Sequence, residues 1–302
     1  MFIEEIKNFS DAIDSKIYFN YDLKKSNWFN IGGKAKVFFK PESLSDLVAF
    51  LKKFGEKEKI FTLGAGSNTL IKDGTIEGIV IKLGKSFSNV SLLSNNLIVA
   101  GSACTDKKLS DFAKDNEISG LEFLACIPGT VGGGLRMNAG CFNREFKDIL
   151  VSVQAIDRKG RVVTIPSRKV LFEYRSNDLP RDLIFLSASI QGEKGDRSVI
   201  EKKILELKEI KDRAQPTKIK TSGSTFKNPI KQTDKKVWEL IKESVPLDTS
   251  FGDAHISSKH CNFFVNKKNA SFKDMNKLIE FVRDRVEKKT GIKLEKEIKI
   301  LD

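Results

Sequence analysis

Residues Gly120–Gly140 read GLEFLACIPGTVGGGLRMNAG, and five of the glycines fall between residues 129 and 140. Glycine has no Cβ and adopts positive φ readily, so this run would let a flat or phosphorylated ligand touch the main chain. Amides at a helix start after such a run favour an anion. A tight turn between core elements would explain the same run. A second glycine loop, LGAGSN at residues 63–68, favours one extended anionic cofactor that both loops hold.

The composition is that of an ordinary globular protein. The chain has 302 residues, enough for two or three domains, with 40% hydrophobic and 31% charged residues. The sequence has no apolar run of membrane-spanning length, and its first residues, MFIEEIKNFSDAI, do not resemble a signal peptide. The four cysteines show no C-x-x-C spacing. We therefore expect a cytoplasmic protein without a metal site, a disulfide framework or a membrane partner.

The formal net charge is +13, which could indicate a nucleic-acid, lipid or phosphorylated partner. Lysine is, however, spread along the chain and mixed with glutamate, as in residues 201–213. The sequence contains no basic run with interleaved aromatic residues. We interpret the charge as a solvated lysine-rich surface and expect no nucleic-acid partner.

The hydrophobic spacing predicts an α+β protein in three parts. The first part, residues 1–84, has a helix at 2–13, a helix opened by Ser43 with Leu44, Leu47, Val48 and Leu51 inward, and strands at 35–39, 60–63 and 78–83. The second part, residues 85–213, has hairpins of 90–93 with 97–100 across Ser94–Asn96 and of 149–156 with 161–165, a strand at 183–190, and helices at 105–116 and 196–213.

The third part, residues 214–302, begins with a polar loop at 221–229. Helices are expected around 235–243 and over 272–290, where Gly291 would end the second one. Strands are expected at 263–265 and 294–300. In the last strand, Leu294, Ile298 and Ile300 would share one face, and Glu297 would lie on the other.

Several familiar site patterns are missing. Histidine occurs only at positions 255 and 260, and no G-x-S-x-G, complete G-x-G-x-x-G or P-loop sequence is present. Three polar features remain: FEYR at 172–175, GSTFKNP at 223–229 and Glu297. Each also has a plain structural explanation, namely an arginine packed on a ring, a turn and a solvated strand face.

An ordered set of motifs indicates which protein family the chain resembles. These motifs are IGGKA at 31–35, GAGSN at 64–68, GLEFLACIPGTVGG at 120–133, MNAG at 137–140, FEYR at 172–175, RAQP at 213–216, GSTFKNP at 223–229, HISSKHCNFFVN at 255–266 and LEKEI at 294–298. Their order and coverage resemble the UDP-N-acetylenolpyruvoylglucosamine reductase family of peptidoglycan precursor synthesis. The chain is similar to the shorter class of that family, which lacks an insert with an extra substrate tyrosine.

The resemblance implies a fold and an activity. The fold would be a two-subdomain FAD-binding module of the vanillyl-alcohol-oxidase/PCMH-like type, followed by an α+β substrate-binding domain. The activity would be reduction of UDP-N-acetylglucosamine enolpyruvate, with NADPH as hydride donor and FAD bound non-covalently. We expect a monomer with only this small molecule as partner.

The resemblance also implies roles for individual residues. Arg175 would contact the substrate carboxylate, Ser224 would donate a proton, and Glu297 would assist as an acid or charge partner. The residues implied to hold substrate are Lys227, Asn228, Arg213 and His260. Those implied to hold FAD are Ile31, Gly32, Gly33, Gly64, Ala65, Gly66, Ser67, Asn68, Ile127, Pro128, Gly129, Thr130, Gly133, Asn138 and Gly140.

The chain departs from the family pattern at Trp28, Asn30, Asn143 and Asn177, and in the segment 245–251 after GSTFKNP. An FAD-dependent oxidase of the same cofactor fold is the alternative function. Many such oxidases tether the flavin through a histidine in the cofactor domain, and the first histidine here is His255. A nucleic-acid-binding protein is a third possibility, but it would leave both glycine loops without a purpose.

Overall fold

The computed structural model describes residues 2–94, 96–217 and 219–302. The chain divides into two compact units. Unit 1 comprises residues up to 19, 37–65 and 78–210, and unit 2 comprises residues 20–36, 66–77 and 211–302. Two short segments from the first quarter of the sequence therefore group with its last ninety residues. The three-part division at residues 84 and 213 stays a prediction.

The first sheet has the strand order β1-β2-β5-β3. Its strands are β1 (Lys16–Asp22), β2 (Lys34–Lys40), β3 (Ile60–Thr62) and β5 (Thr75–Ile81). The predicted strands at 35–39, 60–63 and 78–83 are thus confirmed within a few residues, whereas β1 was not predicted. Its residues alternate between exposed and partly buried and none is fully buried, so its sequence is only a weak indication of a strand.

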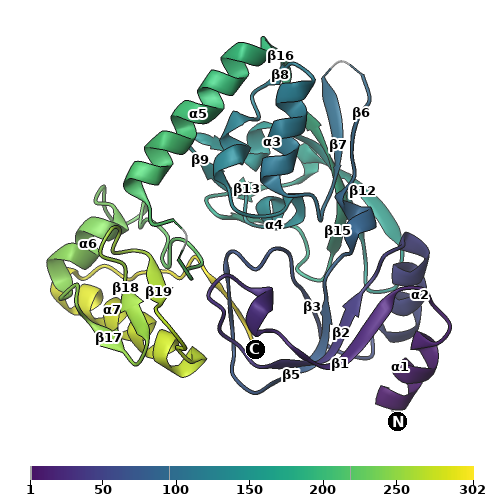
Figure 1. Cartoon of the computed structure of the whole chain (residues 1–302), viewed down its shortest axis with the longest axis horizontal. Helices are drawn as coiled ribbons and strands as arrows, with labels where there is room; N and C mark the ends of the chain where they lie inside the picture. The colour runs from purple at the N-terminus through teal and green to yellow at the C-terminus, as the bar shows by residue number, and fades with distance from the viewer. Residues whose placement is uncertain (1, 95, 218) are drawn as a thin grey trace. The chain divides into compact units, whose positions relative to one another are not determined.

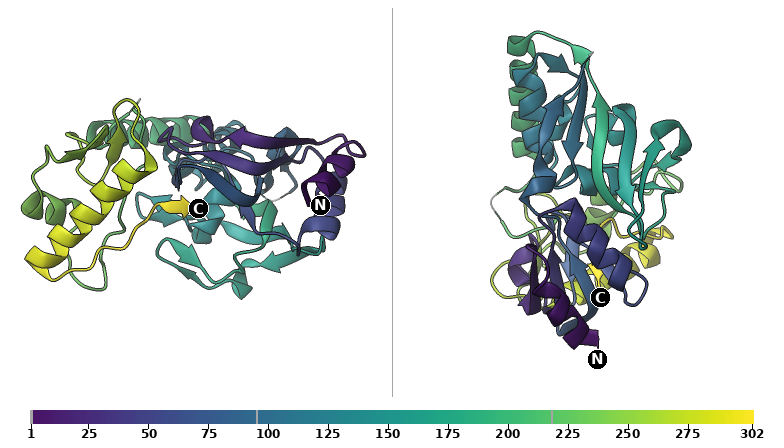
Figure 2. Two further views of the ribbon diagram at one scale, coloured as in Figure 1. Left: turned by 90° about the horizontal axis from the view of Figure 1, so that it is seen from below. Right: turned by 90° about the vertical axis from the view of Figure 1, so that its right-hand side faces the viewer.

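Helices α1 (Phe2–Ser10) and α2 (Leu44–Phe54) lie side by side in unit 1 (Figures 1 and 2). The Phe9 ring meets the rings of Phe50 and Phe54 edge-on, with centroids 5.8 and 5.4 Å apart. Ser43 caps α2 as predicted, since its Oγ accepts from the Asp46 amide at 3.1 Å. Two expectations are wrong. The first helix ends at Ser10 rather than Ile13, and Leu44 is 42% exposed because it is the first residue of its helix.

The second sheet is antiparallel, with the order β12-β11-β15-β7-β6. Both predicted hairpins are confirmed, with Val90 opposite Ala100 and Ile156 opposite Val162; Asn95, in the first turn, lies outside the described residues. Leu109 and Ala113 of α3 pack in one core with sheet residues such as Val153 and Ala188. The strands are β6 (Val90–Leu92), β7 (Leu97–Gly101), β11 (Leu150–Ile156), β12 (Val162–Pro166) and β15 (Ile184–Gln191).

Unit 1 also contains α3 (Asp106–Asp115), α4 (Val131–Arg136) and three two-stranded ribbons. The ribbon strands are β8 (Ile118–Ser119), β9 (Gly140–Cys141), β10 (Arg144–Glu145), β13 (Phe172–Glu173), β14 (Ser176–Asn177) and β16 (Glu193–Lys194). Short 3-10 turns occupy Lys24–Ser26 in unit 2, and Lys85–Ser88, Glu122–Cys126, Phe146–Asp148 and Ser167–Lys169 in unit 1. Helix α5 (Arg197–Ala214) runs from the end of unit 1 into the start of the last segment of unit 2.

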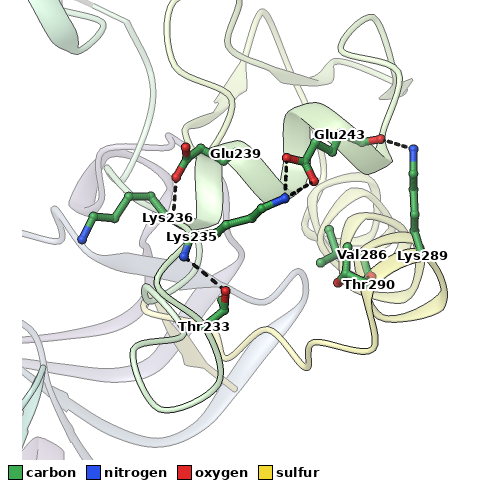
Figure 3. Close-up of polar contacts among 8 residues, drawn as sticks. All are labelled: Thr233, Lys235, Lys236, Glu239, Glu243, Val286, Lys289 and Thr290. Carbon is green, nitrogen blue, oxygen red and sulfur yellow. Dashed lines mark hydrogen bonds and ion pairs between the residues drawn. The ribbon is translucent and has the colours of Figure 1, made fainter.

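Unit 2 has a core formed by α6 (Val237–Ser244), α7 (Phe272–Thr290) and the sheet β17-β18-β19. The Glu243 carbonyl of α6 accepts from Lys289 of α7 and so links the two helices, while the Glu243 carboxylate accepts from Lys235, just before α6 (Figure 3). Gly291 ends α7 in the left-handed conformation, as predicted. The strands are β17 (Ser250–Phe251), β18 (Ala254–Ile256) and β19 (Phe264–Asn266).

The last predicted strand is shorter than expected. β20 covers only Lys299–Leu301, and it pairs in parallel with β4 (Thr69–Ile71) in unit 2. Residues 294–298 belong to no strand and instead form an isolated antiparallel bridge between Lys296 and Phe226. Leu294 and Ile298 are buried as predicted, whereas Ile300 is only partly buried and Leu301 is buried instead, so the predicted apolar face is correct only up to Ile298.

Candidate functional site

The two glycine loops meet at Thr130 within unit 1. A methyl group added to Gly64 would lie 2.9 Å from Thr130 Oγ1, and one added to Gly133 would lie 3.5 Å from the same atom. Both glycines are exposed, and a bridge to Thr105 fixes Thr130. We call Gly64, Thr130 and Gly133 the glycine cradle. Its open main chain and single hydroxyl fit the close approach of a phosphorylated cofactor.

Other glycines of the decisive stretch are explained by protein packing. A methyl group on Gly134 would lie 2.2 Å from the Phe146 ring, and one on Gly140 would lie 2.2 Å from the Arg144 carbonyl. The start of α4 is also less available to an anion than expected. The Val131 and Gly132 amides donate to the carbonyls of Cys104 and Ser102, at 2.9 and 3.0 Å.

Arg175 lies at the turn between β13 and β14, in left-handed backbone with φ of 60°. Its guanidinium lies 5.0 Å from the centroid of the Tyr174 ring, and its Nη2 donates to the Gly140 carbonyl at 3.1 Å. The packing on a ring that we had considered therefore exists.

Asn138, expected to contact FAD, is fully buried in unit 1. Its Nδ2 donates to Glu145 Oε2 and the Glu173 carbonyl, and its Oδ1 accepts from the Lys147 amide at 3.0 Å. These protein partners occupy the side chain, so it holds the backbone in place rather than facing a ligand.

The IGG segment belongs to unit 2, and backbone conformation and close packing explain why its glycines are needed. Gly32 has a φ of 144°, and a methyl group on Gly33 would lie 1.7 Å from the Gly74 carbonyl. A methyl group on Gly66 would likewise lie 2.3 Å from the Ser26 carbonyl. The Trp28 amide donates to the Gly66 carbonyl at 3.1 Å, which joins the IGG segment to the second half of the GAGSN loop.

Asn27 stabilises this arrangement and was not singled out from the sequence. It is buried, and its Nδ2 donates to the Leu23 carbonyl at 3.2 Å and the Ile31 carbonyl at 2.7 Å. These contacts hold the turn 23–31 closed. Trp28 and Asn30, the departures from the family pattern, lie within that turn, and Asn30 supplies a left-handed φ of 52°.

The GSTFKNP segment forms the centre of a small backbone ladder in unit 2. On one side, the Thr225 amide donates to the Asn262 carbonyl at 2.8 Å. On the other, the Glu297 amide donates to the Thr225 carbonyl at 2.8 Å, and the Lys227 amide to Glu295 at 2.9 Å. The ladder therefore places Ser224 and Glu297, which are 73 residues apart in the sequence, on adjacent backbone segments.

Asn262 is a second residue that sequence reasoning missed. Its Oδ1 accepts from the Phe226 amide at 3.0 Å, and its Nδ2 donates to the Phe226 carbonyl at 2.9 Å. This clamp fixes the segment that carries Ser224. A polar residue directly before the apolar run Phe263–Val265 was the only sequence signal for it.

The expected substrate residues have different surroundings. Lys227 Nζ lies 3.4 Å from Glu295 Oε2, with its side chain mostly buried. Asn228 Oδ1 accepts from the Val237 amide at 3.0 Å, so half of its amide supports the start of α6. Arg213 is exposed near the end of α5.

His260 is a neutral donor rather than a cation in this setting. Burial lowers its pKa, and its ring packs edge-on against Phe263 with centroids 4.7 Å apart. Its Nδ1 accepts from the Asn262 amide at 3.3 Å. The proton of the neutral ring is therefore on Nε2, the one nitrogen left to donate to an anion.

Two family models match the chain. An FAD binding domain matches residues 35–166, and the C-terminal domain of UDP-N-acetylenolpyruvoylglucosamine reductase matches residues 215–301. The fold and site thus define an FAD-dependent oxidoreductase with an α+β cofactor-binding module followed by a distinct C-terminal domain.

Relatives identify the family. A UDP-N-acetylenolpyruvoylglucosamine reductase of Pelagibacter ubique is 74% identical over 301 residues, with 100% of both chains covered. The protein of that name from Rickettsia conorii is 47% identical and covers 93% of this chain and 94% of its own. A crystal structure of UDP-N-acetylenolpyruvylglucosamine reductase (MurB) from Thermus caldophilus aligns with a TM-score of 0.81 at 28% identity, over 95% of this chain and 99% of that one. The chain belongs to the UDP-N-acetylenolpyruvoylglucosamine reductase family.

Within residues 2–94, 96–217 and 219–302, no helix has the length and hydrophobicity needed to cross a membrane. The same ranges contain no group of three or more histidine, cysteine, aspartate or glutamate side chains arranged to hold a metal ion.

Proposed function

We propose that this protein reduces UDP-N-acetylglucosamine enolpyruvate to UDP-N-acetylmuramate, with NADPH as reductant and FAD as cofactor. The observation that carries the proposal is the backbone ladder of unit 2, which holds a serine and a glutamate on adjacent segments. A proton donor and a charge partner are what the reduction of an enolpyruvyl ether requires after hydride has been added.

The glycine cradle supports binding of FAD. Two exposed glycines and one hydroxyl leave room for a diphosphate at the main chain of unit 1, where a side chain at either glycine would intrude. We also assign to FAD binding the three residues directly before Thr130, namely Ile127, Pro128 and Gly129. FAD, when bound, accepts hydride from NADPH and delivers it to the alkene of the substrate.

Arg175 binds the substrate carboxylate. Addition of hydride to the alkene leaves negative charge on the carbon next to that carboxylate. A planar guanidinium matches a carboxylate with two parallel hydrogen bonds, and it stabilises the neighbouring charge better than a mobile ammonium would. The bond to Gly140 limits the movement of the side chain.

Ser224 donates the proton that completes the product. Its hydroxyl is a weak acid in water, but the carbon it protonates is a strong base. Lys227, three residues after Ser224 in the sequence, would supply the positive charge that stabilises the resulting alkoxide. Glu297 lies on the adjacent segment, and we assign it the return of a proton to the serine.

We further propose that the enzyme works as a monomer in the cytoplasm. All four cysteines are free thiols, which agrees with a reducing compartment. Burial raises the pKa of the Cys104 thiol to about 11, so that thiol remains protonated at neutral pH.

A two-step flavin assay tests the function. The flavin of the purified protein is reduced with NADPH in the absence of oxygen. UDP-N-acetylglucosamine enolpyruvate is then added, and the return of the visible absorbance of oxidised flavin is followed. Immediate reoxidation with formation of UDP-N-acetylmuramate is the expected result. No response to the enolpyruvyl compound, followed by rapid reoxidation once oxygen is admitted, would instead favour the alternative flavin oxidase.

A further inference from the structure

The hairpin of residues 172–177, which we call the Arg175 hairpin, is too small to hold its own shape. Its strands have two residues each, with Phe172 opposite Asn177 and Glu173 opposite Ser176. Isolated hairpins are at best marginally stable, even when they are longer. Arg175 also has a left-handed φ, which a residue with a side chain adopts only when its surroundings enforce it. Something outside the hairpin must therefore fix it.

Asn177 makes the first external connection. Its Nδ2 donates to the Leu135 carbonyl at 2.8 Å and to the Arg136 carbonyl at 3.1 Å. These are the last two residues of α4, where carbonyls have no partner within the helix. Its Oδ1 accepts from the Leu179 amide at 3.1 Å, just after the hairpin.

A second connection holds the other strand. Asn138, two residues after α4, donates to the Glu173 carbonyl at 3.1 Å, and Arg175 itself donates to the Gly140 carbonyl. The segment 135–140 thus contacts both strands and the turn of the hairpin. This segment directly follows the glycine cradle in the sequence, so α4 connects the two.

Arg136 fixes the chain beyond the hairpin. Its guanidinium donates to the carbonyls of Leu179, Pro180 and Leu183 and lies 4.1 Å from the centroid of the Phe185 ring. Burial lowers its pKa to about 10, which still leaves it charged at neutral pH. Hydrogen bonds therefore hold both the end of α4 and the chain after the hairpin, and we expect a change at Asn177 to displace mainly the hairpin.

We propose that Asn177 is a positioning residue for Arg175: by tying the hairpin to the end of α4, it fixes the guanidinium for the substrate carboxylate. Asn138 supports the same hairpin from the opposite strand. This inference rests on the proposed role of Arg175. It also gives a purpose to the departure at Asn177, where the family pattern has serine: an amide can bond two helix-end carbonyls at once, whereas the single hydroxyl hydrogen of serine cannot.

Asn177→Asp is the sharpest variant, because aspartate keeps the oxygen that accepts from Leu179 but cannot donate to Leu135 and Arg136. We expect normal flavin content and a rate of flavin reduction by NADPH within about twofold of the parent. Reoxidation by UDP-N-acetylglucosamine enolpyruvate should slow by roughly 10- to 100-fold, the scale on which a misplacement of about 1 Å affects catalysis. Asn177→Ala, which adds no charge, should give the same pattern.

Asn116→Asp is the matched control. Asn116 also donates through Nδ2 to a carbonyl at a helix end, that of Phe112 in α3, at 2.8 Å. It belongs to no part of the hairpin. Both half-reactions should keep their parental rates in this variant. A loss of reoxidation equal to that of Asn177→Asp would overturn the proposal, because the effect would then be general to helix ends in unit 1.

A double-mutant cycle with Arg175→Lys separates this inference from the proposed function. If Asn177 acts through Arg175, Asn177→Asp should slow reoxidation much less in the Arg175→Lys background than in the parent. Equal losses in both backgrounds, or no loss in the parent, would overturn the role of Asn177 alone. Unchanged reoxidation in Arg175→Lys by itself would instead remove the proposed role of Arg175, and the inference with it.

Discussion

The Asn68 side chain donates through Nδ2 to the main-chain carbonyl of Glu297 at 3.1 Å, although the two residues are 229 positions apart. The Asn68 carbonyl in turn accepts from the Lys299 amide at 2.9 Å. One residue of the GAGSN loop therefore holds the backbone on both sides of Ile298. Within unit 2, the position of the candidate catalytic glutamate is set by a loop that we also assign to the cofactor.

Replacing Asn68 with aspartate should weaken unit 2. Aspartate cannot donate to the Glu297 carbonyl, and the free energy of unfolding should fall by about 1 kcal/mol, the cost of losing one partly buried hydrogen bond. Urea titration followed by fluorescence measures this. Asn143→Asp is the control, because Asn143 is exposed and left-handed, a conformation that both residue types tolerate. Equal stability of the two variants would contradict the prediction.

Gly133→Ala should lower flavin affinity without harming the fold. The added methyl group would make only an ordinary contact, 3.5 Å from Thr130, and alanine in a helix stabilises the apoprotein by up to about 1 kcal/mol. We expect FAD binding at least roughly tenfold weaker, since the methyl group would occupy the approach to the main chain.

Titration of apoprotein with FAD, together with thermal unfolding, separates the two effects. Gly134→Ala is the contrast, because its methyl group would meet the Phe146 ring at 2.2 Å and should destabilise the protein instead. Undiminished FAD affinity in Gly133→Ala would show that the glycine cradle is not where the cofactor binds.

Ser224→Ala should leave reduction of the flavin by NADPH intact. It should slow reoxidation by the enolpyruvyl substrate by roughly 10²–10⁴, the range for losing a positioned proton donor. Stopped-flow absorbance measures the two half-reactions separately. Ser222→Ala is the control, because that serine is buried and bonded to the Thr69 carbonyl at 3.3 Å. If both half-reactions of Ser224→Ala slow equally, Glu297 becomes the better candidate for the donor.

Asp106 should make the protein less stable as the pH rises. It is fully buried in the first turn of α3, neither carboxylate oxygen has a hydrogen-bond partner among the described residues, and burial raises its pKa well above the usual range. The folded state therefore holds a proton that the unfolded chain releases near pH 4. Above that pH the free energy of unfolding falls, by at most about 1.4 kcal/mol per pH unit, until the folded carboxyl itself ionises.

Asp106→Asn tests this, because asparagine has the shape of the protonated acid and does not titrate. The stability difference between variant and parent should be near zero at pH 4 and should grow in favour of the variant towards pH 8. Urea unfolding at several pH values gives the two curves. Parallel curves would mean that Asp106 is ionised in the folded protein and has a partner.

The sequence predicted local elements well because their signals are local. The Ser43 cap, the Gly291 stop and the two antiparallel hairpins each depend on residues within one short segment, and all are confirmed. The pairing of β20 with β4 depends on residues about 230 positions apart, and nothing near either strand indicates its partner. The extent of the last strand was wrong for that reason.

In the candidate site, ordered motifs identified the residues but not their tasks. All the glycines of the loops look alike in the sequence, yet Gly66 and Gly134 lie against backbone or ring atoms whereas the nearest atom to an added methyl group on Gly64 or Gly133 is one hydroxyl, that of Thr130. Asn138 and Asn228 were expected to contact ligands, and their side chains also bond the protein's own backbone, which the sequence did not indicate. Such distinctions depend on which atoms surround a residue in three dimensions.

The parallel pairing of β4 and β20 also constrains how the chain is made. A ribosome adds roughly 5–20 residues per second, so about 10–50 s separate the synthesis of Ile71 from that of Leu301. During this time the buried side chains of Leu70 and Ile71 have emerged, but the strand that pairs with them does not yet exist. The pairing that completes unit 2 can form only after Leu301 has been synthesised. Chaperone dependence and sensitivity to codon choice should therefore concentrate in unit 2.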